Sequence, residues 1–289
     1  MVRAQHKSWA VVTDLDASLL DSNYSFSGAI EALNKIHEAG FHLVLNSSKT
    51  LEEMRCMVES EAWLWEQKPI LIGENGTTLG LPCVDAGEDS WADYIDITSV
   101  VGEYFCLYDR LSYERIVTIA QGLRKEQGYA FRGFADFTVE ELIALTGLDA
   151  SGAARAQMRN ATEPIFWEDG ASEWMAFEQA LVALGIRAIR GGQFIHLMEA
   201  GYDKSIGVTT LRALLEKRFP SVEWAVLAIG DSPNDQMMLE QADSALVIPN
   251  PKKGTLKLKR VDAFLAEAPA SVGWNAAVLS ILNLNTVQP

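Results

Sequence analysis

The sequence predicts an α/β protein in which a doubly wound, mainly parallel Rossmann-like core sheet carries an inserted α+β domain. Two observations support this fold class. Short apolar runs alternate with amphipathic helical patterns towards both ends of the chain, and such alternation builds a parallel sheet through right-handed crossovers. Between these parts lies a block whose helical and strand patterns do not alternate regularly, as expected of a separate α+β unit.

The first part of the chain reads as strand, helix, strand, helix, strand. Residues 9–13 form an apolar, β-branched run typical of a buried parallel strand. The helical pattern that follows has Ser27 as its expected N-cap and Gly40 at its end. The same reasoning assigns a strand to residues 41–46, a helix to residues 50–65 and a strand to residues 68–73.

The middle block begins where the alternation stops. Its first residues, "CVDAGEDSWADYID", are acidic and weakly periodic, so we expect a loop or a crossing between domains there. We therefore expect a core domain of residues 1–83 and 191–289 and an inserted domain of residues 84–190. Within the insertion, helices are expected over residues 112–128, 138–148 and 150–161, and short strands over residues 163–168 and 186–192.

Alternation resumes in the last third of the chain. The apolar runs there are short enough for strands, and apolar residues recur at helical spacing between them. Strands are expected over residues 193–199, 224–230 and 244–248, and helices over residues 203–219, 233–242 and 270–284.

The composition argues against several classes of protein. With 289 residues, 48% of them hydrophobic, the chain can bury a large core, which argues against disorder. It contains no run of about 18 apolar residues and no signal-peptide pattern, so we expect a cytoplasmic protein without a membrane partner. The three cysteines are too far apart for a C-x-x-C motif.

The net charge restricts the partners of the protein. A formal net charge of -15 argues against binding to nucleic acid or to an anionic membrane, because both require a positive surface. A site for an anionic substrate would have to be locally positive against this overall charge.

Two pairs of aspartates follow apolar strand patterns. Asp14 and Asp16 come after the first strand, and Asp231 and Asp235 follow a later one. Taken singly, either pair could be a polar turn or a helix N-cap. The carboxyl ends of parallel strands lie at one edge of the sheet, so we expect the two pairs to converge there. Convergent carboxylates repel one another unless a cation lies among them, and hard oxygen ligands indicate Mg²⁺ as the cofactor.

Two further polar features lie between these pairs in the sequence. The strand at residues 41–46 ends in "SSKT", whose hydroxyl and backbone N–H groups can bind a phosphate oxygen at a helix start. Lys204 opens another helix and can bring a cation to the same edge. Alone, Ser47 and Ser48 would be helix caps and Lys204 a solvated lysine. The specific signal is the ordered set of carboxylate pair, hydroxyl, lysine and carboxylate pair.

These features, in this order, resemble the four motifs of the haloacid dehalogenase (HAD) superfamily of phosphotransferases. The corresponding residues are Asp14-Leu15-Asp16, Ser47, Lys204 and "GDSPND". The resemblance covers nearly the whole chain, with the inserted domain in the place of the superfamily's C2-type cap.

Shorter motifs are most similar to those of the mannosyl-3-phosphoglycerate phosphatase family. These motifs are "LNSSKT", "GENG", "TEP", and "RGGQFIHL" followed by "DKS". The resemblance implies a cytoplasmic, Mg²⁺-dependent phosphatase that converts mannosyl-3-phosphoglycerate, a small anionic sugar phosphate, to mannosylglycerate, a compatible solute. It leaves open whether the protein is a monomer or a homodimer.

The resemblance also implies a role for each motif residue. Asp14 attacks the phosphorus and forms an aspartyl-phosphate, while Asp16 protonates the leaving oxygen and then deprotonates the attacking water. Ser47 and Lys204 bind the phosphoryl oxygens. The residues expected around Mg²⁺ are Asp14, Asp16 through its backbone carbonyl, Asp231, and Asp235, which orients bound water or Lys204.

The leaving group is expected to lie between the core and the cap. A glycerate carboxylate would bind an arginine, and Arg155, Arg159, Arg187 and Arg190 are candidates, although each could be a solvated surface charge. The resemblance implies substrate contacts at Ser48, Lys49, Glu74, Asn75, Glu163, Arg190, Gly191, Gly192, Gln193 and His196. The alternative for His196, which lies in a short apolar run, is a histidine of the hydrophobic core.

One residue departs from the superfamily pattern, and several other functions stay open. The usual D-x-D-G-T is here D-L-D-A-S, so Ala17 strains the backbone if that position needs a positive φ angle. The alternatives are a phosphatase for glucosyl-3-phosphoglycerate, sucrose phosphate or another sugar phosphate, a phosphomutase, which needs a second phosphate site in the cap, and a non-catalytic binding module.

Overall fold

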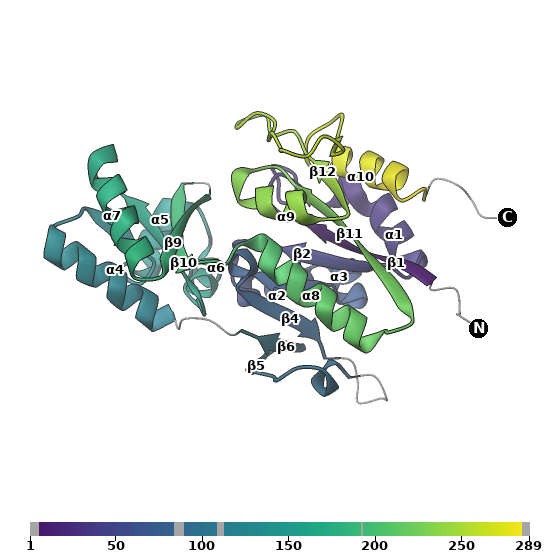
Figure 1. Ribbon diagram of the computed structural model, residues 1–289, viewed down its shortest axis with the longest axis horizontal. Coiled ribbons are helices and arrows are strands. Elements are labelled where there is room, and N and C mark those ends of the chain that lie inside the picture. The colour runs from purple at the N-terminus through teal and green to yellow at the C-terminus, as the bar shows by residue number, and fades with distance from the viewer. Residues whose placement is uncertain (1–5, 84–89, 109–112, 192, 285–289) are drawn as a thin grey trace.

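Two packed units of different size make up the structure, a computed structural model that describes residues 6–83, 90–108, 113–191 and 193–284. The larger unit holds a nine-stranded sheet and the smaller one a four-stranded sheet (Figure 1). The predicted fold class is confirmed: a mainly parallel core sheet carries an inserted antiparallel unit, the cap. Within the described ranges, no helix is long and apolar enough to cross a membrane.

The core sheet has the strand order β13-β12-β11-β1-β2-β3-β4-β6-β5. Strands β13 to β3 of this order pair in parallel, and β4, β6 and β5 add an antiparallel edge. The chain enters the sheet at β1 and then builds outward on both sides, which places a ligand-binding crevice at the carboxyl end of β1. The bounds are β1 His6–Thr13, β2 His42–Asn46, β3 Ile70–Gly73, β4 Thr78–Pro82, β5 Ser99–Val101, β6 Tyr104–Leu107, β11 Val222–Gly230, β12 Ser244–Val247 and β13 Phe264–Leu265.

Helices cover both faces of the core sheet because its central strands are apolar on both sides. Along β1, Val11 packs into one hydrophobic cluster, and Ala10 and Val12 pack into the other. The first cluster includes residues of α1, α2, α3 and α10, and the second includes residues of α8 and α9. The bounds are α1 Ile30–Glu38, α2 Leu51–Ser60, α3 Ala62–Gln67, α8 Lys204–Arg218, α9 Gln236–Gln241 and α10 Ala270–Ile281.

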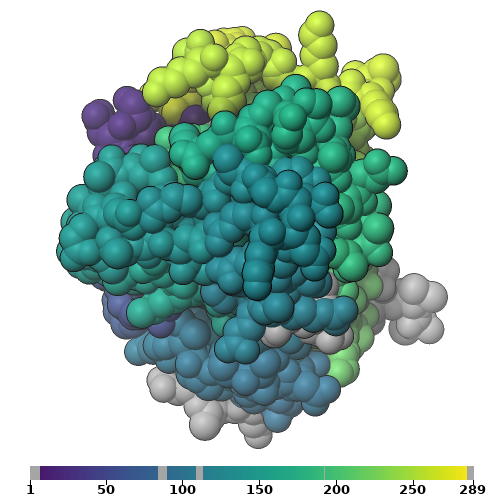
Figure 2. Space-filling view, turned by 90° about the vertical axis from the view of Figure 1, so that its left-hand side faces the viewer, coloured from purple at the N-terminus to yellow at the C-terminus, as the bar shows by residue number. Residues whose placement is uncertain are grey.

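The cap is an antiparallel sheet of order β7-β8-β10-β9 with its own hydrophobic core. Helices α4 and α7 pack on this sheet through Ile116 and Phe177, and α5 and α6 form a smaller cluster around Phe134. Viewed from the cap side, its residues cover much of the core behind them (Figure 2). The bounds are β7 Phe131–Gly133, β8 Thr162–Trp167, β9 Ile186–Gly191, β10 Phe194–Glu199, α4 Tyr113–Gln127, α5 Val139–Thr146, α6 Ala150–Ala156 and α7 Ala171–Ala183.

Some strands near the expected domain limits, residues 84 and 190, do not belong to the sheets that these limits would give them. Strands β5 and β6 lie inside the expected insertion but pair with the core sheet. Strand β10 lies inside the expected core but pairs with β8 and β9 of the cap. We therefore propose that the cap begins after β6 and ends after β10.

Local structure departs from the sequence pattern at a few places. A short 3₁₀ helix, Ser27–Ala29, leads into α1, and Ser27 forms no cap bond with it. The predicted helix over residues 50–65 divides at Glu61, whose backbone is extended. Strands β4, β5, β6, β7 and β13 and helix α7 were not predicted. Part of the predicted loop at the crossing, residues 84–89, lies outside the described residues.

Candidate active site

The predicted aspartates meet at the carboxyl ends of β1 and β11. These two strands pair in parallel along their whole length, and the pairing continues through a hydrogen bond from the Asp14 N–H to the Ile229 carbonyl, 2.9 Å long. Asp14 and Asp231 therefore leave the sheet side by side. Both are buried, with 7% and 3% of their surface exposed.

Lys204 joins Asp14 to Asp235 at the centre of this cluster. It is the first residue of α8 and is fully buried. Its Nζ lies 2.5 Å from Asp14 Oδ1 and 2.6 Å from Asp235 Oδ1. Burial alone would lower the pKa of Lys204, but the two carboxylates together raise it above its usual value. The lysine is therefore held as a cation beside Asp14.

Asp14 lies among more negative charge than one lysine neutralises. Burial raises the pKa of its carboxyl to about 8; Lys204 counteracts this, and the carboxylates of Asp235, Asp231 and Asp16 add to it. A further cation at this place would favour the ionised form of Asp14, which a nucleophile requires.

The carboxylates fit a divalent metal ion. Oxygen atoms of Asp14, Asp231 and Asp235 all lie within 4.8 Å of one another. Both oxygens of Asp235 already accept bonds: Oδ1 from Lys204, and Oδ2 from the N–H groups of Asp231 and Ser232. In the described part of the chain, no donor bonds Asp14 Oδ2 or Asp231 Oδ1. These two oxygens are the available ligands, and Asp235 orders the loop around them.

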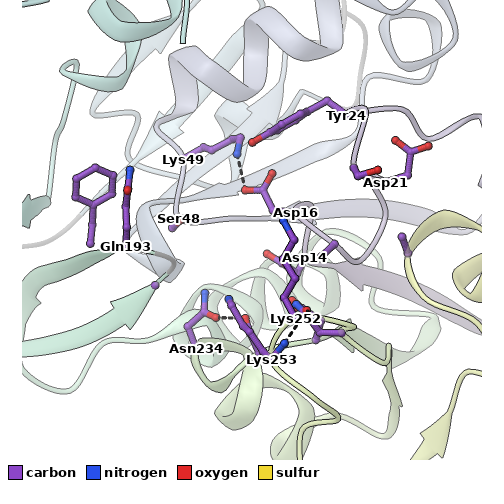
Figure 3. A pocket seen from close by; sticks show the side chains of 18 of the residues that line it. Asp14, Asp16, Asp21, Tyr24, Ser48, Lys49, Gln193, Asn234, Lys252 and Lys253 are labelled. Carbon is purple, nitrogen blue, oxygen red and sulfur yellow. Dashed lines mark hydrogen bonds and ion pairs between the residues drawn. The ribbon is translucent and has the colours of Figure 1, made fainter. Parts of the chain in front are cut away.

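The site residues lie around a cavity of about 790 Å³ between the core and the cap. Asp16 faces this cavity beside Lys49, whose Nζ lies 2.5 Å from Asp16 Oδ2 and 5.6 Å from the centre of the Tyr24 ring (Figure 3). Ser47 is buried, and its hydroxyl accepts a bond from the Lys49 N–H, 3.2 Å long. Of the four predicted catalytic residues, Asp14 and Asp16 line the cavity, while Ser47 and Lys204 lie behind its wall.

Ala17 follows Asp16 with a φ angle of 64°. This left-handed conformation is the one that the glycine of the usual D-x-D-G-T motif adopts without strain. The strain expected of an alanine at this position is therefore present.

The expected substrate residues divide into two groups. Five of them line the cavity: Ser48, Lys49, Gly191, Gln193 and His196. Four do not, namely Glu74, Asn75, Glu163 and Arg190, and Gly192 lies outside the described residues. His196 is both buried and at the cavity wall, and no described group bonds its Nδ1. Burial, with the nearby positive charges of Arg159 and Lys204, lowers the pKa of His196 to about 3.

Among the four candidate arginines, Arg159 lines the cavity. Its Nη1 donates to the Ser48 carbonyl at 2.9 Å, and its guanidinium lies 5.4 Å from the centre of the Phe134 ring. The other three lie elsewhere. Arg187 faces Asp203, Arg190 lies over Trp174, and the carbonyl of Arg155 accepts a bond from Thr50.

The two glutamates expected to contact the substrate are bonded to protein groups instead and do not line the cavity. Glu163 accepts bonds from the Tyr113 hydroxyl at 2.7 Å and from the Ala135 N–H at 3.0 Å, and burial raises its pKa to about 7. Glu74 accepts bonds from the backbone of the cap at residues 160–162.

Sequence reasoning missed one loop that borders the site. The segment "NPKKG" follows β12, and Asn250 Nδ2 donates to Asp231 Oδ2 at 2.5 Å. The same side chain accepts bonds from the N–H groups of Lys252 and Lys253, both of which line the cavity (Figure 3). The two consecutive lysines after the strand predicted at residues 244–248 could have indicated that this loop borders an anion-binding site.

Comparisons with known proteins agree with this geometry. The chain is 31% identical to the glucosyl-3-phosphoglycerate/mannosyl-3-phosphoglycerate phosphatase of Persephonella marina, over 94% of this chain and 97% of that protein. It is 28% identical to a phosphatase of the same name from Methanococcoides burtonii, over 95% and 97%. A haloacid dehalogenase-like hydrolase from Bacteroides thetaiotaomicron has the same fold, with a TM-score of 0.63 at 18% identity, over 95% of this chain and 100% of that chain. No protein-family model matches the chain.

Proposed function

The chain belongs to the haloacid dehalogenase superfamily of phosphatases, and from this premise we propose that it is a Mg²⁺-dependent phosphatase that converts mannosyl-3-phosphoglycerate to mannosylglycerate. One observation carries the proposal. Asp14 directly follows β1, is bonded to the buried Lys204, and faces a cavity that Asp16 and several cationic side chains also line. A carboxylate in such a setting suits nucleophilic attack on a phosphate ester.

The reaction proceeds in two steps. Asp14 attacks the phosphorus, the bond from phosphorus to the glycerate oxygen breaks, and Asp16 gives that oxygen a proton. Water then attacks the aspartyl-phosphate, Asp16 takes a proton from it, and Asp14 and inorganic phosphate are released. Asp16 serves both steps because it faces the cavity two residues beyond the nucleophile.

Mg²⁺ suits the oxygen ligands of Asp14 and Asp231, with Asp235 behind them. When bound, it would neutralise charge so that an anionic carboxylate can approach an anionic ester. The Asp16 backbone carbonyl is the further expected ligand.

The residues behind the wall bind and orient. Lys204 holds Asp14 in place through Oδ1 and offers positive charge to the phosphoryl oxygens. The Ser47 oxygen accepts the Lys49 N–H, so its own hydrogen can be donated to the phosphate. Ser48 lies beside it at the cavity.

The cavity suits a leaving group with one more negative charge. Four cations line it, namely Lys49, Arg159, Lys252 and Lys253, and they face the carboxylates of Asp14, Asp16, Asp21, Glu53 and Asp231. Arg159 is the arginine we assign to the glycerate carboxylate. The aromatic faces of Phe134 and Phe194, also at the wall, suit the apolar face of a sugar ring. Glucosyl-3-phosphoglycerate is the second candidate substrate, because the names of both relatives include it.

A panel of phosphate esters tests the proposal. Phosphate release would be measured with and without Mg²⁺ from mannosyl- and glucosyl-3-phosphoglycerate, sucrose phosphate and a hexose phosphate. We expect Mg²⁺-dependent release, fastest from a glycosyl-3-phosphoglycerate. Faster release from sucrose phosphate would indicate that the substrate is another sugar phosphate. Transfer of phosphate to a second sugar position would indicate a phosphomutase. No release by the folded protein would indicate a non-catalytic binding module.

A further inference from the structure

The Glu74 carboxylate joins the core to the cap through four hydrogen bonds. Its Oε1 accepts the Asn160 N–H at 2.8 Å. Its Oε2 accepts the N–H groups of Ala161 and Thr162 at 3.1 and 2.8 Å, and the Thr162 hydroxyl at 2.8 Å. Three consecutive N–H groups that converge on one anion form a strong and directional contact. Glu74 itself is fully buried, so water does not compete for these bonds.

The loop that carries Glu74 is bonded to the phosphoryl end of the site. The Glu74 N–H donates to the Lys49 carbonyl and the Asn75 N–H donates to the Ser47 carbonyl, each at 2.9 Å. Both residues have left-handed φ angles, 49° and 57°, so the loop turns sharply after β3. A side chain at Gly76 would collide with the Asp203 carbonyl, directly before Lys204. The loop thus touches the segments of two motifs and the cap together.

The cap residues that Glu74 holds lie directly beside cavity residues. Arg159, which precedes the bonded turn, lines the cavity and donates to the Ser48 carbonyl. Thr162 also accepts a bond from Arg159 Nη1 at 3.2 Å. A shift of the turn at residues 160–162 would therefore move the guanidinium relative to the phosphoryl site.

We propose that Glu74 is a positioning residue that sets the distance between the phosphoryl site and the leaving-group side of the cap. It acts through residues 160–162 and Arg159, and it touches neither phosphate nor sugar. This role replaces the substrate contact that the family resemblance implies for Glu74, and its kinetic part rests on the proposed function. Substrates that span both ends of the cavity depend on this distance, and small phosphate esters that occupy only the core end do not.

Glu74→Gln tests the proposal, because the amide keeps one acceptor but directs an NH₂ group at N–H donors. We expect kcat/KM for mannosyl-3-phosphoglycerate to fall by about tenfold to a hundredfold, as expected of a misplaced leaving group. Release from p-nitrophenyl phosphate should change by less than about threefold. Thr162→Val keeps the three N–H bonds to Glu74 but removes the hydroxyl that donates to Glu74 and accepts from Arg159 Nη1. It should lower kcat/KM for mannosyl-3-phosphoglycerate relative to p-nitrophenyl phosphate, by a smaller factor than Glu74→Gln does.

A substrate-free measurement separates this proposal from the proposed function. In hydrogen exchange, the amides of residues 160–162 should exchange at least about tenfold faster in Glu74→Gln, while amides of α4 stay protected. The matched control is Glu141→Gln, which removes a capping carboxylate within the cap that bonds Arg132 and Thr138. Glu141→Gln should leave unchanged both the activity on the two substrates and the hydrogen exchange of residues 160–162. Equal losses on both substrates in Glu74→Gln, or unchanged exchange at residues 160–162, would overturn the positioning role.

Discussion

The two ends of the cavity are built differently. At the core end, Asp14, Lys204 and Asp235 form ion pairs of 2.5 and 2.6 Å between fully or nearly fully buried groups. At the cap end, aromatic side chains, one arginine and a buried histidine make the wall. Charged groups are concentrated at the core end, where the phosphorus would react. At the cap end, where the leaving group would lie, the described residues of the wall are one cation, Arg159, and uncharged side chains. Substitutions at the two ends should therefore affect different properties of the enzyme.

The largest effect is expected from Asp14→Asn at the core end. An amide cannot form the aspartyl-phosphate, so kcat should fall by about 10⁴-fold or more on every substrate. The fold should remain, because the change removes one of several mutually repelling buried carboxylates. A phosphate-release assay measures kcat, and a thermal melt shows whether the fold is retained. Appreciable turnover by the purified variant would mean that Asp14 is not the nucleophile.

Lys204→Met should affect stability as well as turnover. It leaves two buried carboxylates without their cation, which costs about 3–5 kcal/mol in the free energy of unfolding. Urea denaturation checks this value. Lys217→Met, on the exposed side of the same helix, is the control and should cost less than about 1 kcal/mol. A loss as small as that of the control would show that the buried pairs contribute nothing.

At the cap end, Arg159→Met should change selectivity. Removing the guanidinium should lower kcat/KM for a glycosyl-3-phosphoglycerate by about tenfold to a hundredfold, the value of a charge-assisted hydrogen bond of about 1.5–3 kcal/mol. Release from p-nitrophenyl phosphate should stay within about threefold. Arg190→Met, over Trp174 and outside the cavity, is the matched control. If the two variants behave alike, Arg159 does not recognise the carboxylate.

The same contrast explains how far the sequence could predict the site. Asp14 and Asp231 were predicted to converge because parallel strands must end at one edge of the sheet, whatever the remainder of the chain does. Lys204 was predicted from its place at a helix start and in the ordered set of motifs. The cap contacts depend on how two separately folded units pack, and no periodicity in the sequence encodes that. Glu74 and Glu163, expected at the substrate, are instead bonded to cap backbone and to Tyr113.

The fold shows a similar limit. The alternating part of the chain was predicted nearly element by element, since each amphipathic helix and apolar strand has its own pattern. Strands β5 and β6 have three and four residues and follow an acidic segment, so their pattern is too short to recognise. Their place at the antiparallel edge of the core sheet is decided by pairing with β4.

His196 at the cap wall should make stability depend on acid. Its folded pKa of about 3 lies below the unfolded value near 6.5, so below pH 6.5 the unfolded chain binds the proton that the folded chain excludes. Stability from this group is therefore present above pH 6.5 and is lost as the pH falls. Between pH 7 and 5 the loss is about 2 kcal/mol relative to His196→Gln, measured by urea denaturation. His37→Gln, at an exposed position, should keep the wild-type slope, and equal slopes in all three proteins would contradict the prediction.

The smallest effect is expected at Ala17, which directly follows Asp16. Its φ angle of 64° is strained for an alanine, and Ala17→Gly should relieve about 1 kcal/mol of that strain net of the greater freedom of glycine in the unfolded chain. Ala213→Gly, on the exposed face of α8, should destabilise by about 0.5–1 kcal/mol, so the same substitution has opposite signs at the two sites. Turnover should stay within about threefold, because the two aspartates that precede Ala17, Asp14 and Asp16, are held by their own ion pairs. A destabilised Ala17→Gly would mean that packing of the methyl group at the cavity wall outweighs the strain.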